Sequence, residues 1–186
     1  GRTGNSIVRE IFRNSKHLKR FAVSPWSISP LSLSCVEHSE FAANLTSVVL
    51  PRLEEGSSDI LSRFCPNLSE VSLWNVRPED VLALSRLKSI ESLTLSLGSS
   101  DEQQFSRSFE LLGKTEGAKP FHKLWLINAN FESQPFFSSR RCGSIRELSL
   151  SSCKFHEDSI RSLATNVRGT LEVLSGDRKS QIPTFV

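Results

Sequence analysis

The residues with the clearest capacity for chemistry are two Cys-x-x-His segments. Cys35 and His38 form the first, and Cys153 and His156 form the second. Two thiolates and two imidazoles are a common ligand set for tetrahedral zinc. In the repeat organisation inferred below, however, the two segments belong to copies at opposite ends of the array. We therefore expect no metal and no cofactor.

Catalytic signatures do not accompany the four histidines. The sequence contains no GxSxG elbow, HExxH helix, phosphate-binding P-loop or GxGxxG turn. Its many serines fall mostly where loops and strand exteriors are expected. We therefore expect that the chain is not an enzyme.

Other side chains are suited to binding. Trp74 and Trp125 each lie in a short apolar segment, and exposed tryptophans are frequent anchors of protein interfaces. Polar residues of the same and neighbouring segments complete the candidate partner-binding set, which comprises Trp74, Trp125, Asn75, Thr94, Ser96, Lys123, Asn128 and Arg52. Whether they act together depends on the elements that carry them.

A recurring frame organises these segments. Apolar residues occupy positions 1, 4 and 6 of each copy, and apolar or small residues recur at positions 9 and 11. Copies begin at Leu18, Leu45, Leu68, Ile90, Phe121, Ile145 and Leu171. Positions 4 and 6 point to one side of a strand and position 5 to the other. We predict one parallel sheet whose strands centre near 21–23, 48–50, 71–73, 93–95, 124–126 and 148–150.

The segments that return from one strand to the next contain helical patterns. Pro78-Glu79-Asp80 precedes an apolar run, and His156-Glu157-Asp158 precedes another that ends near Gly169. Proline and acidic residues are typical of helix starts, and glycine is typical of helix ends. Ser58 or Asp59 is a candidate cap for a further helix that stops before Pro66.

The frame resembles that of the leucine-rich-repeat superfamily. Copy starts lie 22 to 31 residues apart, around the period of ~20–29 residues typical of these repeats. The string LSLSSCKF, Leu148–Phe155, is the most specific match and is similar to the cysteine-containing and ribonuclease-inhibitor-like branch. The resemblance implies an α/β solenoid, with short parallel strands on a concave face and helices or irregular turns on a convex face. It also implies that the side chain at position 9, here Cys153, binds backbone in the turn.

The resemblance divides the chain into three parts. Residues 1–17, with Val8, Ile11 and Phe12 on one helix face, are expected to be a preceding helix or cap. Residues 18–176 are expected to form about seven irregular repeats, with a flexible insertion at 98–118. Residues 177–186 are expected to be a polar tail. In this organisation Trp74 and Trp125 leave the core side of their strands and face a partner from the concave surface.

The composition of the chain reduces the number of function classes that are expected. Hydrophobic residues make up 38% and charged residues 23% of the chain, which is typical of a folded domain rather than a disordered one. The net charge is only +3, without a stripe of lysine or arginine, so nucleic-acid binding is not expected. No run of about 18 apolar residues is present, so a membrane span is not expected either.

The four cysteines favour a reducing compartment. They are widely spaced and include no CxxC pair, which favours free thiols and a cytoplasmic or nuclear location. The sequons Asn44-Leu45-Thr46 and Asn67-Leu68-Ser69 leave an extracellular recognition ectodomain as an alternative.

The expected function is protein recognition. The chain resembles the F-box and VHL-box substrate receptors of cullin-RING ubiquitin ligases. This implies that the concave face binds a substrate protein or degron, and that ligase subunits bind a region outside the chain. A scaffold or regulatory adaptor in signalling or nuclear complexes is the alternative. Both a folded surface and an extended peptide stay open as ligands.

Overall fold

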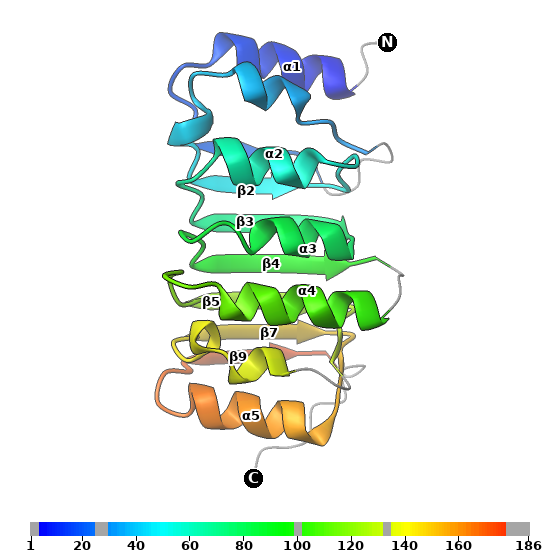
Figure 1. Ribbon diagram of the computed structural model, residues 1–186, viewed down its shortest axis with the longest axis vertical. Helices are drawn as coiled ribbons and strands as arrows, with labels where there is room; N and C mark the ends of the chain where they lie inside the picture. Colours follow the sequence, from blue (N-terminus) through cyan, green and yellow to red (C-terminus); the bar gives the residue numbers. More distant parts are fainter. Residues whose placement is uncertain (1–3, 25–29, 99–101, 132–134, 178–186) are drawn as a thin grey trace.

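The computed structural model describes residues 4–24, 30–98, 102–131 and 135–177 (Figure 1). The helices are α1 (Gly4–Asn14), α2 (Ser57–Phe64), α3 (Pro78–Leu84), α4 (Glu102–Lys114) and α5 (Glu157–Val167). The short 3-10 helices are η1 (Ser34–His38), η2 (Ala42–Asn44), η3 (Pro135–Ser138) and η4 (Arg140–Cys142). The strands are β1 (Arg20–Ala22), β2 (Ser47–Leu50), β3 (Glu70–Val76), β4 (Ser92–Leu97), β5 (Lys123–Ile127), β6 (Asn130–Phe131), β7 (Glu147–Ser151), β8 (Lys154–Phe155) and β9 (Val173–Gly176).

Seven of these strands form one parallel sheet. Their spatial order, β1-β2-β3-β4-β5-β7-β9, follows the order of the chain, and β6 pairs separately with β8. All six predicted strand centres lie in this sheet, so that prediction is confirmed. The chain therefore has an α/β fold in which each strand of the large sheet pairs with the next one along the sequence.

The register of the sheet follows the frame. The residues at position 4 of the seven copies lie opposite one another across the sheet: Phe21, Val48, Val71, Leu93, Leu124, Leu148 and Leu174. The first six of these are buried, with exposed fractions between 0% and 7%. Since a shift of one residue would turn every apolar side chain to the other face, burial of positions 4 and 6 fixes this register.

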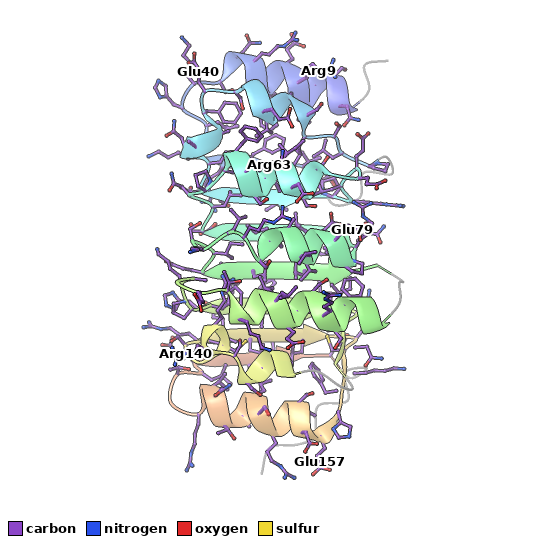
Figure 2. All side chains as sticks on the ribbon, viewed as in Figure 1. Arg9, Glu40, Arg63, Glu79, Arg140 and Glu157 are labelled. Atoms are coloured by element: carbon purple, nitrogen blue, oxygen red, sulfur yellow. The ribbon has the colours of Figure 1, made fainter. Side chains whose placement is uncertain are left out.

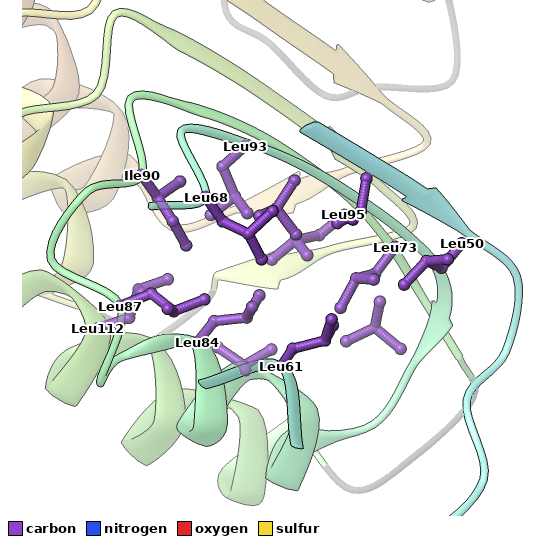
Figure 3. Close-up of a cluster of buried hydrophobic side chains, with 14 of the residues drawn as sticks. Leu50, Leu61, Leu68, Leu73, Leu84, Leu87, Ile90, Leu93, Leu95 and Leu112 are labelled. Carbon is purple, nitrogen blue, oxygen red and sulfur yellow. The ribbon is translucent and has the colours of Figure 1, made fainter. Parts of the chain in front are cut away.

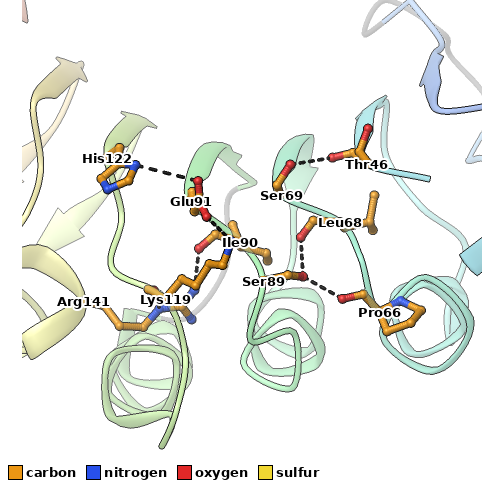
Figure 4. Close-up of polar contacts among 10 residues, drawn as sticks. All are labelled: Thr46, Pro66, Leu68, Ser69, Ser89, Ile90, Glu91, Lys119, His122 and Arg141. Carbon is orange, nitrogen blue, oxygen red and sulfur yellow. Dashed lines mark hydrogen bonds and ion pairs between the residues drawn. The ribbon is translucent and has the colours of Figure 1, made fainter. Parts of the chain in front are cut away.

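Helices α1–α5 lie on one side of the sheet, the side to which positions 4 and 6 point (Figures 1 and 4). The close-up of the core shows Leu73, Leu93 and Leu95 of the strands facing Leu61 and Leu84 of the helices (Figure 3). All five side chains are at most 1% exposed. The core is thus one apolar layer between a sheet and a row of helices.

Charged side chains point away from this layer. Arg63, Glu79 and Glu157 belong to α2, α3 and α5, and all three are exposed on the outside of the molecule (Figure 2). Each of these helices therefore buries one side and presents its charged side to solvent.

Two of the three helix starts predicted from the sequence are confirmed. Helix α3 begins at Pro78, where the Arg77 backbone N–H donates to Asp80 at 3.0 Å. Helix α5 is capped by His156, whose ring accepts a hydrogen bond from the backbone N–H of Asp158. The expected caps of α2 were wrong, because that helix starts at Ser57 and its N-cap is Gly56, at a φ of 79°.

The segment expected to be a flexible insertion contains α4, the longest helix described. Phe105, Phe109 and Leu112 are buried, and their i, i+4, i+7 spacing forms one helix face. Helix α4 packs beside α3. It therefore takes the place that the shorter helices take in the preceding copies. Residues 99–101 of the segment lie outside the described residues.

The N-terminal segment forms a helix, as expected. In α1, Val8 and Phe12 are buried, and the Phe12 ring lies 4.6 Å from that of Phe21 and 5.0 Å from that of Phe41. Ile11, expected on the same face, is 39% exposed. Helix α1 therefore covers the apolar core at the N-terminal end of the sheet.

Serine hydroxyls join successive copies where the chain enters the sheet (Figure 4). The Ser89 hydroxyl lies 2.7 Å from the carbonyl oxygen of Pro66 and 2.6 Å from that of Leu68. The Ser69 hydroxyl donates to the carbonyl of Thr46 at 3.2 Å. The Thr46 carbonyl also accepts the backbone N–H groups of Ser69 and Glu70, so the serine hydroxyls add to the backbone hydrogen bonds between copies.

A buried arginine binds backbone carbonyl groups in the connection between β4 and β5, which is the longest one between neighbouring strands of the large sheet. Arg141 is 2% exposed, and its guanidinium donates to the carbonyls of Ile90, Leu112 and Lys119 at 3.0–3.3 Å. It also lies 4.1 Å from the centre of the Phe121 ring. Burial lowers the pKa of Arg141 to about 10. One side chain thereby joins the segment before β4 to two segments of the connection between β4 and β5.

We expect Leu126→Ala to lower the free energy of unfolding by about 2–5 kcal/mol, because it opens a cavity in the core. Leu126 is fully buried and lies between Leu95 and Leu150 of the adjacent strands. Chemical denaturation measures the change. Ser149→Ala, on the other side of the sheet, is the control and should stay within about 0.5 kcal/mol of the parent chain. Equal stability of the two variants would contradict the position of Leu126 in the core.

We expect Arg141→Met to cost about 3 kcal/mol, because buried carbonyl groups lose their donor. The neighbouring Arg140 is exposed, so Arg140→Met is the matched control and should have little effect. Thermal unfolding of both variants compares them directly. A stability of Arg141→Met equal to that of the control would show that the three hydrogen bonds contribute nothing.

Candidate functional site

The sheet face that points away from α1–α5 is called the strand face below. It carries positions 3, 5 and 7 of each copy. Trp125, at position 5 of β5, is 40% exposed there. The Lys123 ammonium lies 4.3 Å from the centre of its ring and pairs with Glu147 of β7 at 2.9 Å. Lys123 and Trp125 share this face because side chains two apart on a strand point the same way.

Trp74 lies on the same face, two strands away. It is half-buried and pairs in register with Ser96 of β4. Its indole Nε1–H is buried, and no acceptor is found for it among the described residues. Such an unpaired donor costs free energy until it finds an acceptor.

Small residues separate the two tryptophans. Thr94 lies directly opposite Trp125, and Ser96 lies one strand from both Trp74 and Ile127. A spacing of ~4.8 Å between strands and ~3.3 Å along them puts the two tryptophan backbones about 12 Å apart. A single bound segment can touch both rings, with Thr94 and Ser96 beneath it.

The other candidates lie at the carboxyl ends of the strands. Asn75 and Asn128 both occupy position 8, with φ values of 55° and 57°, and Ser152 shares that position with a φ of 53°. Asparagine tolerates this left-handed conformation better than most residues, so the backbone itself accounts for both asparagines. The side-chain oxygen of Asn75 also lies against Gly98, where an added Cβ would come within 2.7 Å. Arg52 is exposed at the equivalent place after β2.

The structure therefore divides the predicted set in two. Five residues gather on the strand face of β3–β5, and these are Trp74, Thr94, Ser96, Lys123 and Trp125. The other three lie in a separate row at the carboxyl ends of the strands: Asn75, Asn128 and Arg52.

Charges of both signs run along the amino ends of the strands. Three ion pairs link neighbouring or next-but-one strands: Arg20 with Glu70 at 3.4 Å, Lys123 with Glu147 at 2.9 Å, and Arg146 with Glu172 at 3.8 Å. Glu91 contacts Lys119 and lies 3.8 Å from the His122 ring (Figure 4). Because the signs alternate, this edge has no single-sign field that would favour a highly charged ligand.

Two features were missed from the sequence. The contact of Lys123 with Trp125 was open to detection, because period-2 alternation puts them on one face. The role of Arg141 was not, because the segment around η4 lies outside the apolar frame.

The two Cys-x-x-His segments lie far apart in the fold. Cys35 belongs to η1, whereas Cys153 follows β7, with β3, β4 and β5 between them. The Cys153 thiol lies 3.3 Å from the backbone carbonyl oxygen of Leu126 in β5 and 3.3 Å from that of Ser151 at the end of β7. Burial raises the pKa of Cys153 to about 11.

Comparison of the chain with protein-family models, with curated proteins and with solved structures finds no match. In the part of the chain that the structure describes, no helix is both long and apolar enough to cross a membrane.

We expect an impermeant alkylating reagent at pH 8 to label Cys35 well before the other three cysteines. Cys65, Cys142 and Cys153 are fully buried, whereas Cys35 is half-buried. Burial also raises the pKa values of Cys65 and Cys142 to about 12, so these thiols stay protonated and unreactive. Mass spectrometry counts the labels, and the denatured chain, with four, is the control. Rapid native labelling of Cys153 would mean that the turn after β7 is wrongly assigned.

Proposed function

We propose that this chain is a leucine-rich-repeat solenoid that recognises another protein through the strand face around Trp125 and Trp74. The single observation that carries the proposal is that Trp125, 40% exposed, shares one face of a regular sheet with Trp74, with small residues of β4 between them. A tryptophan fixed on a rigid element offers a large contact area at little cost in conformational entropy.

The order of the strands supports the solenoid. Each strand pairs with the next in sequence, and the helices lie on one face of the sheet. A doubly wound α/β sheet instead reverses its strand order and carries helices on both faces. The left-handed residue at position 8 in three copies and the contact of Cys153 with the backbone of the neighbouring copy also support the repeat.

Regular spacing also favours a protein or peptide ligand. The strand face repeats at ~4.8 Å intervals from β2 to β7, which suits contact with an extended segment or a flat protein surface. Its hydroxyl groups and paired ionic groups supply polar surroundings for the tryptophans. Interfaces commonly combine a central aromatic anchor with such a polar rim.

The role we propose is that of a substrate- or degron-binding part of a cullin-RING ubiquitin ligase receptor, in the cytoplasm or nucleus. This rests on resemblance of the repeats alone, and the ligase subunits would bind outside this chain. All four cysteines are free thiols, which supports a reducing compartment. A scaffold or regulatory adaptor is the alternative that uses the same surface.

The proposal predicts that Trp125→Ser removes partners that the parent chain captures from cell extract. Truncation of an interface anchor typically costs ~2 kcal/mol or more, about 30-fold in affinity. Quantitative mass spectrometry of parallel pull-downs measures the loss. Trp74→Phe should weaken the same partners less, because it keeps most of the ring area.

Leu111→Ser is the matched control. Leu111 is an equally exposed apolar residue, at 41%, but it lies on α4, on the opposite side of the molecule. Its partners should match those of the parent chain. Equal capture by Trp125→Ser, at an unchanged melting temperature, would overturn the proposed surface.

A further inference from the structure

A polar groove lies between the carboxyl end of α4 and the segment that contains η3 and η4, on the side of the molecule opposite the two tryptophans. Its volume is about 830 Å³. Residues of α4 and of the loop after it form one wall, and Ser138–Arg141 with Ser144 form the other. Copies continue on both sides of the groove, unlike at the C-terminal end of the sheet, where residues 178–186 of the expected polar tail lie outside the described residues.

The groove arises from the return between β5 and β7. The returns before and after this one contain α-helices of 13 and 11 residues, α4 and α5. The described part of this return instead contains η3 and η4, of four and three residues. Two short turns fill less space beside α4 than a full helix would, and the space that they leave is the groove.

Cations outnumber carboxylates around the groove. Its lining contains Lys114, Arg140 and Arg141 against Glu110 and Glu116. Lys114 pairs with Glu110. Arg140 is exposed (Figure 2), and no carboxylate pairs with it or with Arg141 among the described residues. Two guanidinium groups therefore line the groove without a counter-charge of their own.

Further donors for an anion lie in the same place. Ser138 is exposed and Ser144 is half-buried, and neither hydroxyl makes a hydrogen bond within the described part of the chain. The Lys88 ammonium lies at the rim, 3.7 Å from the position that a Cβ on Gly117 would take. Guanidinium, ammonium and hydroxyl groups are the side-chain donors with which proteins bind phosphate groups.

The carboxyl end of a helix repels anions, because its last carbonyl groups carry partial negative charge. In α4 these groups already have donors. The carbonyl of Leu112 accepts a hydrogen bond from the Arg141 guanidinium at 3.3 Å, and the Thr115 hydroxyl lies 3.1 Å from the carbonyl oxygen of Leu111. The buried cation thereby offsets part of the negative charge at this end of the helix.

We propose that this groove binds a phosphorylated serine or threonine in a segment of a partner protein, with Arg140 as the main phosphate-binding residue. A phosphate monoester carries about two negative charges and three acceptor oxygens, so it matches a guanidinium with two hydroxyl groups better than a carboxylate does. This site goes beyond the function proposed above and does not depend on it.

The size and lining of the groove favour a peptide over other sources of phosphate. The volume exceeds what a phosphate group alone fills, so further atoms of the ligand must occupy the remainder. None of the described residues that line the groove is aromatic, and nucleobases without a stacking partner bind weakly. The carboxylate of Glu116 disfavours a polyanion such as nucleic acid, and instead suits a basic residue beside the phosphorylated one.

The first test measures binding of the full chain to immobilised degenerate peptides with a central phosphoserine. These peptides should retain the parent chain, and the same peptides with serine should not. Arg140→Gln should weaken binding about tenfold or more, which is the usual effect of losing a hydrogen bond to a charged group. Arg140→Lys keeps the charge but loses the fork of donors, so it should weaken binding less.

Arg63→Gln is the matched control. Arg63 is an exposed arginine of α2, on the same side of the molecule but away from the groove (Figure 2). Its replacement removes the same charge and should leave binding unchanged. The melting temperatures of all variants are measured in parallel.

The second test locates the site by NMR on the isotope-labelled full chain, with N-acetyl-phosphoserine amide as the probe. The backbone amides of residues 113–118 and 138–144 should shift. The indole N–H signals of Trp74 and Trp125 should not, because they lie on the other side of the sheet.

Several outcomes would overturn the phosphopeptide site. One is a parent chain that does not prefer the phosphoserine peptides. Another is equal binding by Arg140→Gln and Arg63→Gln at unchanged melting temperatures, and a third is chemical-shift changes that lie outside the groove. Inorganic phosphate, a single-stranded oligonucleotide and peptides with a central aspartate serve as competitors. Displacement of the phosphopeptides by one of these at an equal or lower concentration would assign the groove to that ligand instead.

Discussion

A single strand with one returning segment cannot bury its own apolar side chains, and this constraint determines the arrangement of the molecule. Leu124 and Leu126 are removed from water only because β4, β7 and the helices beside them supply walls on every side. Every parallel pair in the sheet repeats this solution. The same constraint affects the backbone. Because the copies stack at the spacing of neighbouring strands, some backbone carbonyl groups between them need hydrogen-bond donors. The Ser89 hydroxyl supplies a donor in a shorter connection, and the Arg141 guanidinium supplies donors to Leu112 and Lys119 in the longest one. The buried cation lacks a carboxylate partner in the contacts described, so its desolvation is offset by three carbonyl oxygens and an aromatic ring.

Much of this arrangement could be predicted from the sequence, because the two-residue alternation of a strand can be recognised within a short segment. Alternation in segments such as Leu148–Leu150 identifies the inward side chains, and their recurrence identifies which strands pair. Helix α4 was missed for an equally physical reason. Glycine and serine at 98–100 and glycine at 113 and 117 suggest a loop, and they outweighed the spacing of Phe105, Phe109 and Leu112. Local propensity is a weak guide where packing against a neighbour decides the outcome, and here the neighbour is α3.

The sequence was sufficient to predict which face of the sheet carries the two tryptophans, but not which side chains contact each other there. Parity alone assigns Trp74 and Trp125 to the side away from the core, and the register confirms that one strand separates them. Asn75 and Asn128 were predicted to bind a partner, but their backbone conformation accounts for these residues without any ligand. A pattern of residue types cannot separate these two causes, because asparagine suits a left-handed turn as well as a binding surface. Only the φ angles distinguish them.

In this architecture the residues that stabilise the fold differ from those of the proposed recognition surface. Positions 4 and 6 of each strand contribute the buried area, whereas positions 3, 5 and 7 contribute little to stacking. A side chain at position 5 can therefore change from Ser72 to Thr94 to Trp125 across three successive strands without disturbing the register. Trp125 is held by neighbours that are themselves fixed, including Lys123, whose ammonium is restrained by Glu147. The free-energy cost of ordering the ring is thus met during folding rather than on binding. A surface of this kind can acquire a strong anchor at one position while the fold beneath it stays the same, which is why the exposed tryptophan is better evidence of a binding role than any feature of the core.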